Sequence, residues 1–245
     1  MTENLKENSG QLVVKDNDLI RKSRYSLTAN QQKLIAYITS RIKPTDKEFK
    51  REYISVADFC KLCNIDKKHF YTEFKDMIDN LDSKSFWIEN EDVLTKFHWF
   101  HEVKVNKGSG IIELVLNTYL QEYLLGLREN FTKYELYNVL LMKSKYSLRL
   151  YELFKSYEWQ KNIYIELEKL KEYLNTESYK KTNDFKKRCL KPAVEEINRL
   201  TDINISYTEK KRGRAIVGFN FSIQLKEAVD RGLLFRDYID TAANK

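Results

Sequence analysis

The sequence predicts an α+β protein made of two tandem winged helix-turn-helix domains that are related by an internal repeat. The first observation is a pair of matching helix starts. A capping box, Thr28-Ala-Asn-Gln31, opens one helix, and Ser144 opens another 116 residues later. Apolar residues follow both starts at the same helical spacing, and they are Leu34, Ile35 and Ile38 in the first copy and Leu150, Tyr151 and Phe154 in the second.

A strand–helix segment also occurs twice. The stretch ISVADFCKLCN (54–64) matches IELEKLKEYLN (165–175), because each begins with the isoleucine of a short strand and spaces its apolar residues alike. Each segment ends in an asparagine, Asn64 or Asn175, a residue type that readily adopts the left-handed conformation at a helix end. We therefore expect a helix stop at both positions.

A longer helix and a hairpin complete each copy. Apolar residues recur every third or fourth position at Phe70, Phe74, Ile78 and Leu81, and then at Phe185, Cys189, Ala193 and Ile197. The stretches SFWIEN (85–90) and TDINIS (201–206) are predicted strands. Hairpins are expected at 103–116 and 207–221, where Gly108, Gly110 and Gly213 lie near the tips. Helix, strand, helix, helix and a two-stranded wing is the element order of a winged helix-turn-helix.

These elements predict four segments. Residues 1–12 are expected to be a flexible tail, 13–128 the first winged-helix domain and 129–225 the second. Residues 226–245 form a C-terminal tail that is a candidate for a further helix. The second domain is the expected main DNA-binding unit. The first is expected to serve dimerisation or regulation, with weaker DNA contact.

The composition describes an ordinary cytoplasmic protein with a charged half. Apolar residues make up 42% of the chain and charged residues 32%, and the longest apolar run is too short to span a membrane. The polar N-terminus lacks the apolar stretch of a signal peptide, and three cysteines suit a reducing compartment. Residues 1–130 contain equal numbers of basic and acidic residues, so the net charge of +7 comes from residues 131–245. This asymmetry predicts that the C-terminal half faces a polyanion.

The charge gathers on the predicted groove helix of the second copy. In a helix-turn-helix the second helix enters the major groove, where exposed donors contact phosphates and base edges. Here an apolar stripe that includes Phe185 and Leu200 lies opposite a mostly cationic side that presents Lys180, Asp184, Lys187, Arg188 and Lys191. In the first copy, Lys67, Lys68 and Lys75 are outnumbered by acidic residues between Asp66 and Asp82, so that helix is expected to read DNA poorly.

Pro192 lies inside the groove helix and has no amide proton for the carbonyl of Arg188. We expect a bend or a loosened turn there. Our hypothesis is that the proline sets where the helix leaves the DNA, with Glu195 and Glu196 lying beyond the phosphates.

Two further segments are candidates for phosphate contact. The second wing tip carries Lys210, Lys211, Arg212 and Arg214, whereas the first has only Lys107. The amino end of the helix opened by Ser144, with Lys145 and Tyr146, is also expected to hold a phosphate. Each neutralised phosphate makes DNA affinity depend on salt.

Signals for catalysis or metal binding are weak. Cys60 and Cys63 have the spacing of half a zinc site, but no second pair exists, so buried packing is the preferred interpretation. His98 and His101 would lie on opposite faces of one strand because two residues separate them. No phosphate-binding Gly-rich motif occurs, and Tyr146, Tyr151 and Tyr157 lie at helical spacing, which is typical of core residues. We expect no enzyme activity, metal or cofactor.

Three stretches resemble the iteron-binding plasmid replication initiators: NDLIRKSRYSLTANQQKLIAYITSRI near the start, SKYSLRLYELFKSY (144–157) and FKKRCLKPAVEEIN (185–198). The resemblance covers roughly residues 13–225. It implies a non-enzymatic initiator whose monomers bind direct repeats at a plasmid origin, promote melting, and recruit the host initiator and the replicative helicase. It also implies homodimers formed through the N-terminal domain, which often repress their own gene. The family's recognition helix corresponds to the segment around 180–192, so the resemblance implies DNA contacts by Lys180, Lys181, Lys187, Arg188 and Lys191.

Two alternatives remain open from the sequence. A transcriptional regulator with tandem winged helices would bind palindromic operators rather than head-to-tail repeats. A rolling-circle initiator would cleave single-stranded origin DNA with a tyrosine nucleophile.

Overall fold

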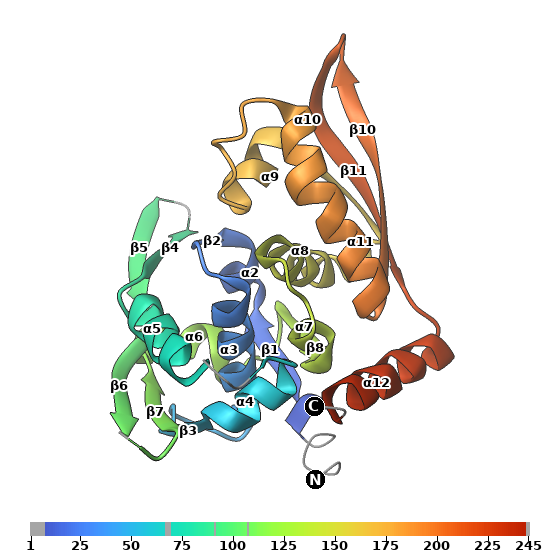
Figure 1. The fold of residues 1–245 in the computed structure, drawn as a ribbon. Helices are drawn as coiled ribbons and strands as arrows, with labels where there is room; N and C mark the ends of the chain where they lie inside the picture. The colour runs from blue at the N-terminus through green and yellow to red at the C-terminus, as the bar shows by residue number, and fades with distance from the viewer. Residues whose placement is uncertain (1–7, 67–69, 91, 107, 244–245) are drawn as a thin grey trace.

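The computed structural model describes residues 8–66, 70–90, 92–106 and 108–243, and Figure 1 shows their arrangement. The first winged-helix unit follows three short elements, β1 (Leu12–Asp16), α2 (Asn17–Lys22) and β2 (Ser23–Arg24). Its own elements are α3 (Ala29–Ser40), β3 (Glu52–Ser55), α4 (Val56–Leu62), α5 (Phe70–Asp82), β4 (Ser85–Asn90), β5 (Val93–His98), β6 (Phe100–Asn106), β7 (Ile111–Leu116), η1 (Thr118–Leu120) and α6 (Gln121–Leu124).

The second unit repeats this order and ends in an extra helix. Its elements are β8 (Phe131–Glu135), α7 (Tyr137–Leu140), α8 (Lys145–Ser156), η2 (Glu158–Gln160), β9 (Asn162–Glu166), α9 (Leu167–Tyr173), α10 (Thr182–Phe185), the π-helical turn η3 (Lys186–Leu190), α11 (Lys191–Leu200), β10 (Ile203–Arg212), β11 (Ala215–Leu225) and α12 (Ala228–Ala243).

The internal repeat is confirmed element by element. Helices α3 and α8 are each 12 residues long, and Thr28 and Ser144 cap them with their side-chain oxygens. Asn64 and Asn175 have φ angles of 52° and 51°, the left-handed conformation expected where α4 and α9 end. Each unit closes with a three-stranded sheet, of order β3-β7-β6 in the first and β10-β11-β9 in the second. The predicted pair of winged helices is therefore correct.

The copies differ between the groove helix and the wing, where both predicted strands form but are not equivalent. The stretch 85–90 forms β4, which pairs with β5 and β2 rather than leading into a wing. Its supposed counterpart at 201–206 belongs to β10, a strand of the wing itself. The first unit thus contains an added hairpin. His98 ends β5 and His101 lies in β6, so they belong to different sheets rather than to opposite faces of one strand.

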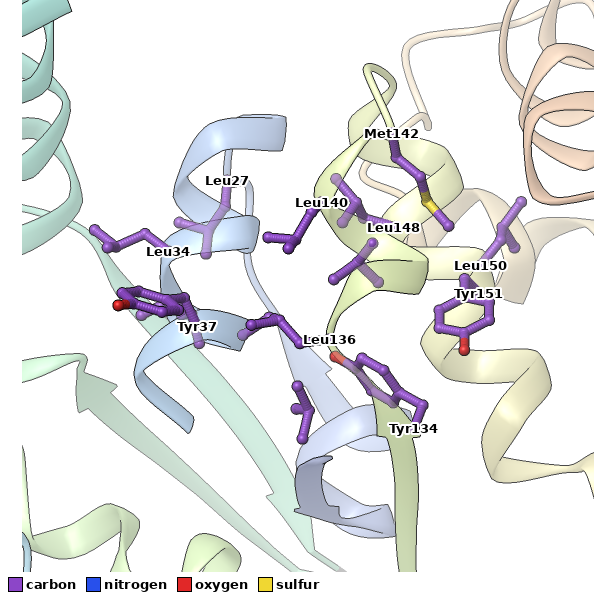
Figure 2. Packing of buried hydrophobic residues seen from close by; sticks show 14 of the residues in the cluster. Leu27, Leu34, Tyr37, Tyr134, Leu136, Leu140, Met142, Leu148, Leu150 and Tyr151 are labelled. Atoms are coloured by element: carbon purple, nitrogen blue, oxygen red, sulfur yellow. The ribbon is translucent and has the colours of Figure 1, made fainter. Parts of the chain in front are cut away.

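Helix α8 joins the two units through one continuous apolar core. Figure 2 shows Leu140 and Leu148 of the second unit beside α3, and they belong to the same buried cluster as Leu27, Leu34 and Tyr37. The strand β8 pairs antiparallel with β1, so the boundary that we predict at 128/129 is crossed by a β ladder. Rotation of one unit against the other would therefore have to disrupt packed apolar surface and this ladder.

The same interface contains a buried ion pair. Lys15 Nζ lies 2.5 Å from Glu152 Oε1, and the Tyr134 hydroxyl donates to the same oxygen at 2.5 Å. Burial alone would raise the pKa of Glu152, but Lys15 and Tyr134 outweigh it, so the pKa lies below its ordinary value. This carboxylate therefore stabilises the fold while it is ionised.

Helix α12 forms in the tail after residue 226 and returns to the first unit (Figure 1). The Tyr238 hydroxyl donates to the carbonyl of Leu62 in α4 at 3.0 Å. The ring of Tyr137 lies 5.1 Å from that of Phe235, measured between centroids. The chain after the second wing is thereby fixed to α4 and α7.

We expect Glu152→Gln to lower the free energy of unfolding by roughly 3 kcal/mol at pH 7, because the Lys15 ammonium would stay buried without a counter-charge. The folded pKa of Glu152 is depressed, so its contribution is present above the unfolded pKa and is lost as pH falls through the folded value. The difference between the two proteins in urea unfolding should therefore shrink below about pH 4.5. Glu168→Gln, which alters an exposed partner of Lys171, is the control. Equal stability of all three proteins would contradict the assigned role.

Candidate nucleic-acid interface

The groove helix of the second unit is built from α10, η3 and α11 in sequence. Its apolar stripe faces the core, with Phe185, Cys189, Leu190, Ala193 and Ile197 buried. Three cations on the other side are exposed, namely Lys187, Arg188 and Lys191. Lys191 lies 3.8 Å from exposed Glu195, a pair that contributes little in water. The helix therefore presents free guanidinium and ammonium groups to solvent.

The proline produces a local change of helix type. The amide of Lys191 bonds to the carbonyl of Lys186, five residues earlier, and residues Lys186–Leu190 form a π-helical turn. Pro192 follows directly, near the start of α11. Because Pro192 cannot donate to Arg188, the widened turn accommodates the ring without breaking the helix. The loosened turn predicted from the sequence is confirmed.

The second wing is a long hairpin that projects beyond the helices (Figure 1). Strands β10 and β11 pair antiparallel, with an irregularity between Lys210 and Lys211. Gly213 has φ 62°, which the tight turn requires. The four cations at the tip, Lys210, Lys211, Arg212 and Arg214, are all exposed, and Lys211 also lies 3.3 Å from Glu209.

Lys186 joins the groove helix to the wing, a role the sequence did not indicate. Its ammonium forms an ion pair with Glu209 of β10. The side-chain hydrogen bond from Lys186 lowers the pKa of Glu209. Since this contact orients the helix and the wing relative to each other, Lys186 is not freely available to DNA.

The loop before the groove helix carries the remaining predicted contacts. Lys180 and Lys181 are both exposed there. Tyr146 of α8 bonds through its hydroxyl to Tyr179 and to Cys189, and burial together with Cys189 raises the pKa of the Tyr146 hydroxyl. The half-buried Tyr146 therefore contacts the groove helix through Cys189, and its expected DNA contact stays a prediction.

The amino end of α8 is already occupied by a carboxylate. Glu196 accepts hydrogen bonds from the amides of Lys143 and Ser144 at 2.9 and 3.1 Å. The Ser144 hydroxyl accepts from the amides of Tyr146 and Ser147. Glu196 thus lies at the helix end where we expected a phosphate, rather than beyond the DNA backbone. The group left for an anion there is the half-buried side chain of Lys145.

The first unit offers a different surface. On α5 the exposed side chains include Glu73, Asp76, Asp79 and Asp82, with Lys75 as an exposed cation. The residues Lys67, Lys68 and His69 and the wing residue Lys107 lie outside the described residues. The weaker DNA contact expected of this unit stays a prediction.

The cysteines and tyrosines considered for metal binding or catalysis are mostly packed inside the protein. Cys60, Cys63 and Cys189 are free and buried, and burial raises the pKa of Cys63 to about 12. Tyr151 is fully buried, and Tyr157 stacks under the guanidinium of Arg21. Among the residues that the structure describes, no group of three metal-liganding side chains gathers, and no helix is long and apolar enough to cross a membrane.

Two winged-helix units with an exposed basic helix and wing define the class of tandem winged-helix proteins. Comparison with known proteins identifies the family within this class. A family model described as "Initiator Replication protein, WH1" matches residues 12–155, and one described as "Initiator Rep protein, WH2" matches residues 166–223. The chain belongs to this family of initiator replication proteins.

One curated relative and one solved structure are also initiator proteins. A replication initiation protein of Escherichia coli is 29% identical over 234 residues, which cover 89% of this chain and 71% of the relative. The crystal structure of the Pi initiator protein in complex with iteron DNA superposes with a TM-score of 0.74 at 19% identity, covering 90% of this chain and 99% of that one. This structural likeness shows the shared fold.

We expect Pro192→Ala to keep the fold but to alter DNA binding or bending. An alanine amide can bond to Arg188, so the π turn should tighten and shift Lys187 and Arg188 around the helix axis. Fluorescence anisotropy would measure the affinity for DNA. Energy transfer between labels at the two DNA ends would measure the bend. Pro44→Ala, the same change in an exposed loop of the first unit, is the matched control. If Pro192→Ala behaves like the wild type in both measurements, the proline is only a tolerated irregularity.

Proposed function

We propose that this protein is a plasmid replication initiator that binds direct repeats, or iterons, at its origin, promotes opening of the duplex and recruits host replication proteins. The observation that carries the proposal is the exposed cationic side of the groove helix in the second unit. Burial of the apolar stripe on the opposite side of this helix directs Lys187, Arg188 and Lys191 toward solvent. The Pi initiator, which shares the fold, is described in complex with iteron DNA.

The proposed contacts divide by their chemistry. Lys187, Arg188 and Lys191 would enter the major groove, where cations bond to guanine edges or phosphates. The exposed cations of the wing tip and of the loop at Lys180 and Lys181 would follow the backbone. Lys145 would add a phosphate contact beside the groove helix. Ser144 and Tyr146 would hold this surface in place from within the protein.

The proposed activity needs no catalysis and no cofactor. Deforming a duplex costs free energy, which contacts formed only with the deformed DNA can supply. The wing and the groove helix are in direct contact through the ion pair between Lys186 and Glu209, and we propose that they bind DNA together. Binding through both would strain the repeat rather than the protein, which is the physical basis we propose for origin opening. The host initiator and the replicative helicase are the proposed next partners.

We further propose that homodimers form through the first unit, in equilibrium with monomers, and that the dimer represses its own gene. Strand β5 is the free edge of the sheet β2-β4-β5, and edge strands pair readily with a second chain. Val93 and Leu94 on this strand are 60% and 56% exposed. Residues 1–130 have no net charge, which would also allow two copies to approach.

The DNA-binding proposal predicts that replacing Lys187, Arg188 and Lys191 together with glutamine weakens iteron binding by about a hundredfold or more while the circular dichroism spectrum is unchanged. The slope of log affinity against log salt should fall by up to about 3, because three cationic contacts are lost. Replacing Lys43, Lys47 and Lys50, which are exposed in a loop of the first unit, removes the same charge and is the control. Equal losses from both triple variants would contradict the assignment.

The dimer proposal predicts that Val93→Lys combined with Leu94→Lys raises the dissociation constant of the homodimer about tenfold or more in sedimentation equilibrium. Two cations on an edge strand oppose pairing with an identical strand. Trp159→Lys, which changes a 76% exposed residue of the second unit, should leave self-association unchanged. A greater effect of Trp159→Lys would place the dimer contact in the second unit instead.

A further inference from the structure

The internal repeat places a buried cation at the same position in both copies. Lys33 is the fifth residue of α3, and Arg149 is the fifth residue of α8. Each side chain is only 4% exposed. Burying a cation is costly unless it has a partner, so the surroundings of the two residues can be compared directly.

Arg149 is fully enclosed in what we name the closed junction, formed by Ser23, Tyr25, Arg149, Tyr173 and Asn175. Its guanidinium carbon lies 3.9 Å from the ring centroid of Tyr25 and 4.0 Å from that of Tyr173. One guanidinium nitrogen donates to the carbonyl of Ser23 at 3.0 Å, and the other two nitrogens have no hydrogen-bond partner but lie against these rings. Asn175 completes the contact by donating to the carbonyl of Tyr25 at 2.6 Å. The segment before α3 thus fills the space beside α8.

Lys33 has no such enclosure. Among the described residues its ammonium has no hydrogen-bond or ion-pair partner. Asn64, the counterpart of Asn175, has a buried side-chain oxygen without a hydrogen-bond partner. Both residues line a cleft between the two units, which we name the open junction and which Lys143, Glu196 and Arg199 also line. One of two equivalent positions is therefore filled by protein, and the other is left open.

The charge of the open junction is positive. Lys143 and Arg199 are exposed at its rim, and Lys33 lies at its wall. The carboxylate of Glu196 also faces the cleft, but its two oxygens accept the amides of Lys143 and Ser144. Ala29 and Asn30 add first-turn amides of α3, which have no acceptor within the helix. Burial also lowers the pKa of Lys33, so a bound anion would relieve a real cost.

The cleft lies between the elements that carry the two groove helices. The side chain of Gln31, at the amino end of α3, donates to Met77 and Asn80 of α5 at 3.1 and 3.0 Å. Glu196 and Arg199 belong to α11, which continues the groove helix of the second unit. An anion held here would contact both units at once and would fix their groove helices relative to each other.

We propose that the open junction binds a phosphate group, with Lys33 as its buried ligand and Lys143 and Arg199 as rim ligands. The group is either a phosphodiester of DNA bound across the two units or a soluble phosphate. The first source rests on the proposed DNA-binding function, whereas the second does not. Lys33→Met is the test variant, because methionine retains an apolar side chain in the buried position and removes the charged ligand.

The first experiment uses the full chain without DNA. Inorganic phosphate is titrated against chloride at matched ionic strength, and the thermal midpoint is followed. If the source is soluble phosphate, it raises the midpoint of the wild type, and Lys33→Met weakens the apparent affinity about tenfold or more. Lys171→Met is the matched control, since Lys171 is a buried lysine that pairs with Glu168 away from the cleft.

The second experiment uses iteron DNA that has been ethylated at single phosphates. If the source is DNA, ethylation of one particular phosphate weakens binding by the wild type and by Lys171→Met. Lys33→Met should bind the ethylated and the unmodified DNA with the same affinity. If Lys33→Met differs from the wild type in either experiment as described, the proposal is supported, and the experiment that shows the difference identifies the source of the phosphate. If it differs in neither experiment, the proposal is wrong. Should Lys33→Met fail to fold, the exposed pair Lys143→Met and Arg199→Met gives the same two readouts. Absence of iteron binding by the wild type would refute the proposed function but leave the first experiment decisive.

Discussion

The packing around α8 is the constraint on which the relation between the two units depends, and the enclosure of Arg149 is part of it. Two tyrosine rings face the π surface of this buried guanidinium and a backbone carbonyl accepts a hydrogen bond from one nitrogen, while Nε and Nη1 have no hydrogen-bond partner, so the rings carry much of the stabilisation. Tyr25 precedes the first unit's main helix, and Tyr173 belongs to the second unit. The cation therefore holds both units against α8, and the groove helices, which pack on that framework, inherit their spacing from it.

Duplication kept the framework and let the surfaces diverge. The caps at Thr28 and Ser144 and the left-handed residues Asn64 and Asn175 define helix ends, so they are the same in both copies. The exposed faces have no such constraint. Acidic side chains dominate α5, whereas the equivalent face of the second unit is cationic. Since phosphate repels one face and attracts the other, the two copies can take different tasks on one fold.

Local features could be predicted from the sequence, and contacts between distant segments could not. Caps, helix stops, glycine turns and the loosened turn at Pro192 are decided by neighbouring residues, so their prediction succeeds. The strand at 85–90 has the same local pattern as a wing strand, and only its pairing with β5 and β2 distinguishes it. The same limit applies to Glu196, which caps a helix 52 residues earlier, and to Lys186, whose partner lies on the wing. Side-chain charge identified these residues, but their partners depend on the tertiary fold.

Helix α12 forms part of the wall of the open junction. It leaves the second wing and is fixed to α4 by Tyr238, and its residue Thr241 lines the open junction. The units are also joined by the continuous apolar core and by the ladder between β1 and β8, which hold the walls of the cleft in place. An anion bound beside Lys33 would therefore add a contact between two units whose relative position is already fixed. Its effect would be a gain in the stability of the folded chain, because a ligand that binds only the folded state raises the free energy of unfolding.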